Sequence, residues 1–166
     1  MALVVAFSNW LKSTELSWAV RHFPWIWPAS ETLHFMGLAM LIGAVGLVDL
    51  RMLGVAKGVP FAALHKLVPW GIAGFVINTI TGILFFAGDP FQYINNIAFG
   101  LKILFILLAG LNMAAFYLFG VFRTAEALGP GDDAPLSAKV IAGSSLFLWI
   151  GVMYLGRMLP FIGNAF

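Results

Sequence analysis

The chain has 166 residues, of which 61% are hydrophobic and only 10% are charged. Soluble domains carry about 25% charged residues, so this composition excludes an ordinary soluble fold and predicts a single-domain membrane protein. The formal net charge of +2 is small and the sequence has no basic run, which argues against nucleic acid as a partner. Because the chain has no cysteine, it can form no disulfide, thiolate metal site or cysteine nucleophile.

The N-terminal segment, residues 1–28, differs in pattern from the rest of the chain. Lys12, Glu15 and Arg21 interrupt its apolar residues, so it is a poor membrane span. Its aromatic and aliphatic side chains can share one helix face, and we expect an amphipathic helix lying in the membrane interface. The Trp- and Pro-rich residues 23–28 then predict a bend that returns the chain into the bilayer.

Residues 29–166 contain four apolar stretches, at about 31–53, 61–87, 97–120 and 136–159. Each is long enough to cross about 30 Å of hydrocarbon, which takes roughly 20 helical residues. Ser30 is the predicted N-cap of the first span, Gly54 its stop, and Pro69 is expected to bend the second. The runs lack the alternation of barrel strands, so the predicted fold class is an all-α membrane protein, a bundle of four transmembrane helices with an N-terminal interfacial amphipathic helix.

Basic residues in the short connections predict the orientation of the bundle. Lysines and arginines flank the first and third connections, whereas the second has none and contains Asp89. We therefore expect a multi-pass protein of the bacterial inner (cytoplasmic) membrane, with its N- and C-termini on the outer side.

Charged residues within a span cost several kcal/mol, so each needs a partner or a function. On the predicted outer side lie Glu31, His34, Lys102 and Arg157, and His22 can fold back over His34. On the inner side lie Asp49, Arg51, Lys66 and Arg123. Glu31 and Asp49 are eighteen residues apart, five full helical turns, so both are expected on one stripe that faces the bundle interior.

Two interpretations of these charges remain open. In the structural one, Glu31 pairs with Lys102 or Arg157, and Asp49 pairs with Lys66 or Arg123, which locks the helices in register. In the functional one, the outer cluster holds a cofactor, a quinone headgroup or a proton. We assign the inner charges, Arg51 included, to structural ion pairs. Near the midplane, Asn78 and Asn112 are expected at similar depths, where they can hydrogen-bond each other.

His34 is the best candidate metal ligand, because it lies within a span beside an acidic residue that can orient its ring. As a ligand of haem b it needs a second axial partner or an open site. His22 is on the same side, whereas His65 begins the second span on the opposite side. Met36 and Met40 hint weakly at copper, but Met36 points away from His34 on a helix.

Several short motifs resemble one family. They are Glu31-Thr32-Leu33-His34 with Gly37, Val48-Asp49-Leu50-Arg51 with Leu53-Gly54, Pro69-Trp70 with Gly74-Phe75, Thr81-Gly82 with Leu84-Phe85, Ala98-Phe99 with Lys102, Ala109-Gly110-Leu111-Asn112, and Gly156-Arg157. Over about residues 10–160 the chain resembles a bacterial family of small four-helix membrane proteins catalogued as a domain of unknown function. That family is distantly similar to four-helix haem-binding membrane cytochromes and to copper-resistance membrane domains.

The resemblance implies that His34, Lys102 and Arg157 occupy positions typical of the family. Tyr117 stands where relatives often place a histidine, which argues against haem on the inner side.

We therefore expect a small membrane subunit of a bacterial redox or respiratory-type assembly, which binds haem b or a quinone at the outer cluster. Lys102 and Arg157 would then neutralise the haem propionates. No Ser/His/Asp set or phosphate loop is present, so we expect no catalytic activity of its own. One alternative is a cofactor-free scaffold or a homo-oligomeric structural protein, whose polar cluster could hold lipid. Another is a small ion-coupled carrier. The expected partners are the lipid bilayer and either further copies of the chain or a larger membrane complex.

Overall fold

The computed structural model describes residues 2–55 and 57–162, and 81% of the model is helical. Four segments are long and apolar enough to cross a membrane: α3 (Ile26–Leu53), α4 with α5 (Phe61–His65 and Val68–Gly88), α7 (Ile97–Leu118) and α9 (Leu136–Met158). The described residues contain no strand. The predicted fold class, an all-α membrane bundle of four spans, is therefore confirmed.

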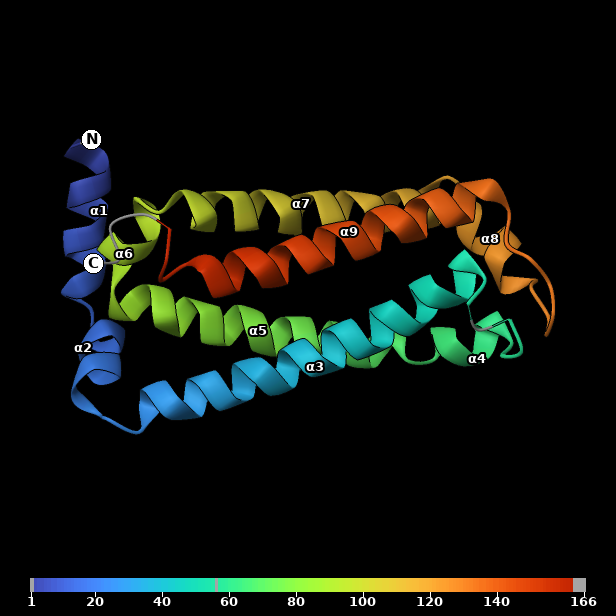
Figure 1. Ribbon diagram of the computed structural model, residues 1–166. Coiled ribbons are helices and arrows are strands. Elements are labelled where there is room, and N and C mark those ends of the chain that lie inside the picture. The colour runs from blue at the N-terminus through green and yellow to red at the C-terminus, as the bar shows by residue number, and fades with distance from the viewer. Residues whose placement is uncertain (1, 56, 163–166) are drawn as a thin grey trace.

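The long helices form two hairpins, α3 with α5 and α7 with α9, and contacts between α3 and α9 join the hairpins. Figure 1 shows α1 (Ala2–Lys12) and α2 (Glu15–His22) lying across the bundle axis at one end, beside α6 (Pro90–Ile94). The short helices α4 and α8 (Val121–Glu126) lie at the opposite end. We call these the α1/α2 end and the α4/α8 end.

The N-terminal segment forms two helices where the sequence predicted one. The chain turns at Thr14, whose hydroxyl oxygen caps α2 by accepting from the Ser17 backbone N–H at 3.3 Å. The Ser17 hydroxyl in turn donates to the Ala87 carbonyl at the end of α5, at 2.7 Å, and this bond fixes α2 to the bundle. Leu3 and Trp10 remain 86% and 60% exposed, as an interfacial helix requires for contact with lipid.

The first span begins at Ile26, five residues before the predicted start at position 31. Pro28 stands within the first turn of α3, where its missing N–H would have had no acceptor in the helix. The predicted N-cap Ser30 is wrong, because this residue lies inside α3 and is only 4% exposed. The predicted stop is confirmed: Gly54 ends α3 in the left-handed conformation, with φ 95°.

The other predicted spans lie close to the observed helices. The second is broken at Lys66 and Leu67, just before Pro69, which stands in the first turn of α5. The third ends at Leu118, before Gly120, whose φ of 74° turns the chain into α8. These breaks occur where proline or glycine interrupts helical geometry.

The closest helix crossing joins α3 and α5 at two glycines. A Cβ atom on Gly37 would lie 2.8 Å from Asn78 Nδ2 and 2.9 Å from the Gly74 carbonyl oxygen. Gly37 therefore permits the close contact expected of small residues between membrane helices. Gly43 and Gly46 of the same helix make no such contact, because no other part of the described chain lies within 4 Å of a Cβ built at either glycine.

A buried apolar cluster lies at the α4/α8 end of the bundle. Its residues come from α3, α4, α7, α8, α9 and the loop before α9: Val48, Met52, Phe61, Phe116, Val121, Ala125, Ala134, Ala138 and Ala142. Hydrophobic packing therefore joins all four spans at this end.

Candidate functional site

A short hydrogen bond joins two of the spans, between His34 Nδ1 on α3 and Thr81 Oγ1 on α5, at 2.7 Å. The Thr81 hydroxyl has one hydrogen, which it donates to the Ile77 carbonyl at 2.8 Å. With the Thr81 hydroxyl donating to that carbonyl, Thr81 Oγ1 accepts from His34, and we assign the ring proton of His34 to Nδ1. The lone pair of His34 lies on Nε2, for which the described residues provide no hydrogen-bond partner.

Aromatic side chains border this histidine. The Phe85 ring meets the His34 ring edge to face at a centroid distance of 5.5 Å, and the centre of the Trp27 ring lies 5.0 Å from that of Phe85. Trp27 Nε1 donates to Glu31 Oε1 at 3.3 Å. Glu31 is itself exposed, so the predicted inward stripe is correct for Asp49 and wrong for Glu31.

Lys102 of α7 is half-buried, and its charge reaches His34. Its side chain runs along α9, where a Cβ atom on Gly156 would lie 3.6 Å from Lys102 Nζ. Arg157 is exposed, and its guanidinium carbon lies 5.8 Å from the centre of the Phe161 ring. Lys102 Nζ therefore lies beside Gly156 of α9, whereas Arg157 contacts an aromatic ring beyond the end of α9.

The predicted outer ion pairs are not formed. The salt bridges of the described residues join Lys12 to Asp89 at 3.5 Å, and join Asp133 to both Lys57 and Lys139, at 2.8 and 2.6 Å. Glu31 takes part in none of them, because its carboxylate binds the Trp27 indole instead. The predicted pairing of Glu31 with Lys102 or Arg157 is therefore wrong.

The α1/α2 end also carries a phenol held among carboxylates. Burial, with the charges of Asp89 and Glu31, raises the pKa of Tyr93 to about 12. Tyr93 on α6 therefore stays protonated across the physiological range. It packs against Phe86 and Phe99, which extends the aromatic border of this end.

The other two histidines do not join His34. His22 Nδ1 contacts the Trp18 carbonyl at 2.8 Å, and its ring stacks on that indole with centroids 4.5 Å apart. His65 lies at the α4/α8 end, where its Nε2 contacts the Tyr117 hydroxyl at 2.9 Å. The described residues contain no group of three or more His, Cys, Asp or Glu side chains able to hold a metal ion.

Arg51 binds backbone carbonyls. Its predicted ion pair with a carboxylate is therefore wrong. Its side chain is completely buried and donates to Val59 O at 2.6 Å, Gly129 O at 2.8 Å and Asp132 O at 3.1 Å. These carbonyls belong to the α3–α4 and α8–α9 connections, so Arg51 joins two loops. The negative end of the α3 dipole adds a favourable field, because Arg51 is in the last turn of that helix.

Asp49 likewise lacks the predicted cation. It is 3% exposed, its polar neighbour is Ser145 of α9, and its Oδ2 atom has no hydrogen-bond partner. Lys66 and Arg123 are exposed and form no salt bridge within the described residues. Their prediction as ion-pair partners of Asp49 is therefore wrong, because both long side chains extend toward the surface.

The two midplane asparagines bond separately. Asn78 Nδ2 donates to the Gly74 carbonyl of its own helix at 3.0 Å, and Asn112 Nδ2 donates to the Ile141 carbonyl of α9 at 3.0 Å. The expected bond between them is wrong, because α5 packs with α3 whereas α7 packs with α9. Asn112 therefore stabilises the second hairpin and Asn78 the glycine crossing of the first.

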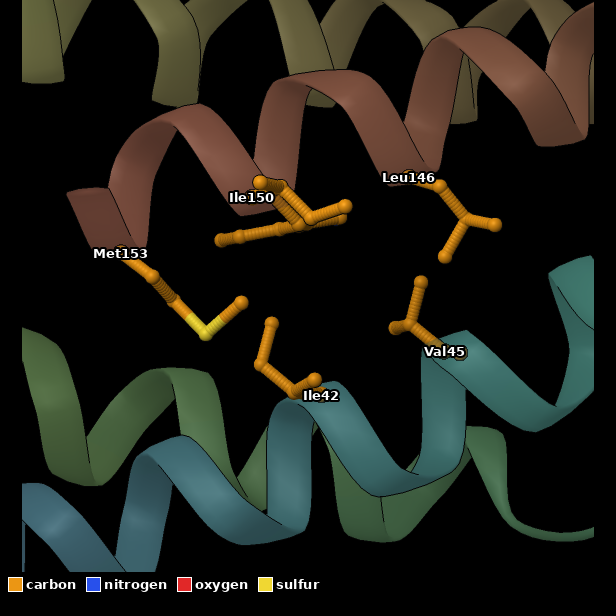
Figure 2. Close-up of a pocket in the computed structure, with 7 residues that line it drawn as sticks. Ile42, Val45, Leu146, Ile150 and Met153 are labelled. Atoms are coloured by element: carbon orange, nitrogen blue, oxygen red, sulfur yellow. The ribbon is translucent and has the colours of Figure 1, made fainter.

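A small apolar cavity separates α3 from α9 near the middle of the bundle. Figure 2 shows Ile42 and Val45 of α3 facing Leu146, Ile150 and Met153 of α9 across it. Its volume is about 20 Å³, room for about one water molecule, and its lining carries no polar surface. This cavity is too small for a haem or a quinone ring.

Three side chains important to this arrangement were not singled out as site residues. Thr81 fixes the His34 ring, and Phe85 packs against it. Asn96 donates to the Leu159 and Ile162 carbonyls at 2.9 and 2.6 Å and so ties the start of α7 to the end of α9. The sequence signal for Asn96 was its position directly before an apolar run, which is typical of an N-cap, and its Oδ1 does accept from Ala98 N.

Comparison with protein-family models, curated proteins and solved structures finds no match to this chain. The resemblance carried by the short motifs stays a prediction.

Proposed function

We propose that this multi-pass membrane protein binds a quinone or quinol headgroup beside His34, as a small non-catalytic subunit of a bacterial respiratory-type assembly. The observation that carries the proposal is the His34–Thr81 hydrogen bond, which leaves the Nε2 lone pair without a partner at membrane depth. A quinol hydroxyl is a donor that reaches such sites from the lipid phase, and imidazole nitrogen is a suitable acceptor for it.

The neighbouring side chains suit the rest of such a headgroup. Phe85 and Trp27 offer ring faces and edges to a planar ring. Lys102 supplies an ammonium group whose charge reaches His34 and which can donate to a quinone carbonyl. One charged donor, one neutral acceptor and an apolar border are typical of a small-molecule site.

Haem b is the second candidate, because an axial histidine also binds iron through a free nitrogen while its other nitrogen donates to a second group. The described residues fit it less well. His22, the expected second axial ligand, is held against Trp18, and Arg157, an expected propionate partner, lies over Phe161. Quinone is favoured because it needs one histidine.

The test is a titration of the detergent-purified protein with decylubiquinone, followed by tryptophan quenching. We expect saturable binding that His34→Leu weakens at least tenfold, whereas His65→Leu, the matched change at the α4/α8 end, leaves it unchanged. Thr81→Val should also weaken binding, since the ring then loses its orienting partner, and Thr81→Ser should restore it. Equal binding by both histidine variants would refute the proposal.

The visible spectrum separates the two cofactors. Protein from haem-supplied cells should show no Soret band. A Soret band that disappears in His34→Leu would show that His34 binds haem b and would contradict the quinone proposal.

The proposed assignment to the bacterial inner membrane puts the α1/α2 end on the outer side. Because the chain has no cysteine, single cysteines at Ser13 and Glu126 report the two faces without background. An impermeant maleimide applied to intact spheroplasts should label position 13 and spare position 126, and the reverse result would invert the orientation. The predicted outer position of the C-terminus concerns residues 163–166, which lie outside the described residues.

Association with further subunits is part of the same proposal. The α7 face carries exposed leucines, with Leu107, Leu111 and Leu118 at 61%, 66% and 80% exposure, which lipid or a neighbouring subunit must cover. Native mass spectrometry from membranes should show this chain bound to other subunits. If the chain is detected only as a monomer, that result would contradict its association with other subunits.

A further inference from the structure

We propose that Asp49 is an intramembrane proton-binding site, a carboxylic acid held neutral at the seam between α3 and α9. The site is separate from the one around His34, and nothing in the proposed quinone binding requires it.

The first observation is that the carboxyl group is buried without charge compensation. Asp49 is 3% exposed and Oδ2 makes no hydrogen bond, while the salt bridges of the described chain all involve other carboxylates. A lone carboxylate in an apolar interior is strongly disfavoured, and such a group takes up a proton instead. The neutral acid needs only hydrogen-bond partners, and the Ser145 hydroxyl is beside it.

The second observation is that the seam is apolar in both directions from Asp49. Toward the middle of the bundle, one helical turn from Asp49, the α3/α9 cavity is lined by apolar side chains and by Gly46. Apolar cavities of this kind stay empty of water. Toward the α4/α8 end lies the buried cluster that includes Met52 and Ala142. Apolar side chains therefore flank Asp49 in both directions along this seam.

The third observation is that no neighbouring element offers a cation. Helix α5 has no ionisable side chain, and the ionisable groups of α2 lie at the opposite end of the bundle. On the other elements that pack against α3 the basic groups are engaged elsewhere, namely His65 of α4 with Tyr117, and Lys139 and Arg157 of α9 with Asp133 and Phe161. The remaining ionisable group of α9, Tyr154, is a phenol that cannot carry a positive charge and is 60% exposed. Arg51, on α3 itself, donates to three carbonyls. The proton is therefore the cation that remains for Asp49.

Infrared spectroscopy of the purified protein in lipid tests the proposal, because a protonated carboxyl group has its own carbonyl-stretch band. At about pH 6 we expect one such band that shifts in D2O and disappears in Asp49→Asn. The matched variant Glu31→Gln removes an exposed carboxylate and should keep it, as should His34→Leu, so quinone binding and proton binding can fail independently. Absence of the band, or its persistence in Asp49→Asn, would overturn the proposal.

If Asp49→Asn does not fold, the same band is measured in wild-type protein labelled with carboxyl-13C aspartate. The label can identify the group because the chain has only four aspartates, Asp49, Asp89, Asp132 and Asp133. The acid band must then shift with the isotope, and must persist when the three loop aspartates are changed together to asparagine. A band that does not shift, or that is lost with the loop aspartates, contradicts the assignment.

Discussion

Replacing Arg51 with methionine tests how a buried charge is held without a counterion. The guanidinium group makes three hydrogen bonds, of 2.6, 2.8 and 3.1 Å. Bonds from a charged donor contribute about 1.5–3 kcal/mol each. Methionine regains apolar contact and the freed loop carbonyls can regain some water, so the net loss is smaller than their sum. We expect the free energy of unfolding to fall by about 3–5 kcal/mol, as for breaking other buried charge networks.

The assay is reversible unfolding in mixed detergent micelles with increasing SDS, followed by far-UV circular dichroism. Arg51→Lys keeps the charge but lacks the planar fork that reaches separate acceptors, so its loss should lie between wild type and Arg51→Met. Arg123→Met, at an exposed arginine with no salt bridge among the described residues, should change stability by no more than about 0.5 kcal/mol. The reasoning is refuted if Arg51→Met lies within about 1 kcal/mol of wild type, or if lysine restores full stability.

Two further predictions concern a helix crossing and a loop. Gly37→Ala places a Cβ atom 2.8 Å from Asn78 Nδ2 of α5 and should lower the free energy of unfolding by about 1–3 kcal/mol in the same assay. Gly43→Ala meets no atom within 4 Å, so it should be neutral or slightly stabilising. Equal effects of the two substitutions would contradict the observed crossing. Hydrogen bonds from Lys139 and Lys57 lower the pKa of Asp133 to about 2, below its value of about 3.9 in an unfolded chain. The folded state therefore binds this proton more weakly, so the stabilisation is present above about pH 4 and is lost as the pH falls toward 2. Asp133→Asn should remove this acid-dependent loss, and an unchanged pH profile would show that the pairing contributes nothing.

The positions of the spans could be predicted because the signals that set them are local. Hydropathy over about 20 residues, Gly54 at a helix end and Pro69 in a first turn each act within one segment of chain. The start of α3 was missed for a local reason too. The Pro-rich pattern predicts a break at Pro28 and therefore a cap at Ser30, but the first turn of a helix tolerates proline and α3 begins before it.

The partners of the polar groups could not be predicted, because they depend on how distant segments meet. The acceptors of Arg51 in the α8–α9 connection lie 78 and 81 residues away, and Thr81 lies 47 residues from His34. A sequence shows that a charge lies in a span and needs compensation, and opposite charges are the obvious candidates. In this fold, backbone carbonyls bind Arg51 and a threonine hydroxyl binds His34. Sequence spacing alone does not reveal these partners.

Photoaffinity labelling with a short-chain azidoquinone tests the proposed site most directly. We predict that cross-linked peptides map to α3 and α5 around His34 and Phe85, that excess decylubiquinone suppresses them, and that His34→Leu removes them. Labelling spread over the exposed faces of α7 and α9, unaffected by competitor or by His34→Leu, would show that the probe merely dissolves in the lipid around the bundle and would contradict quinone binding at this site.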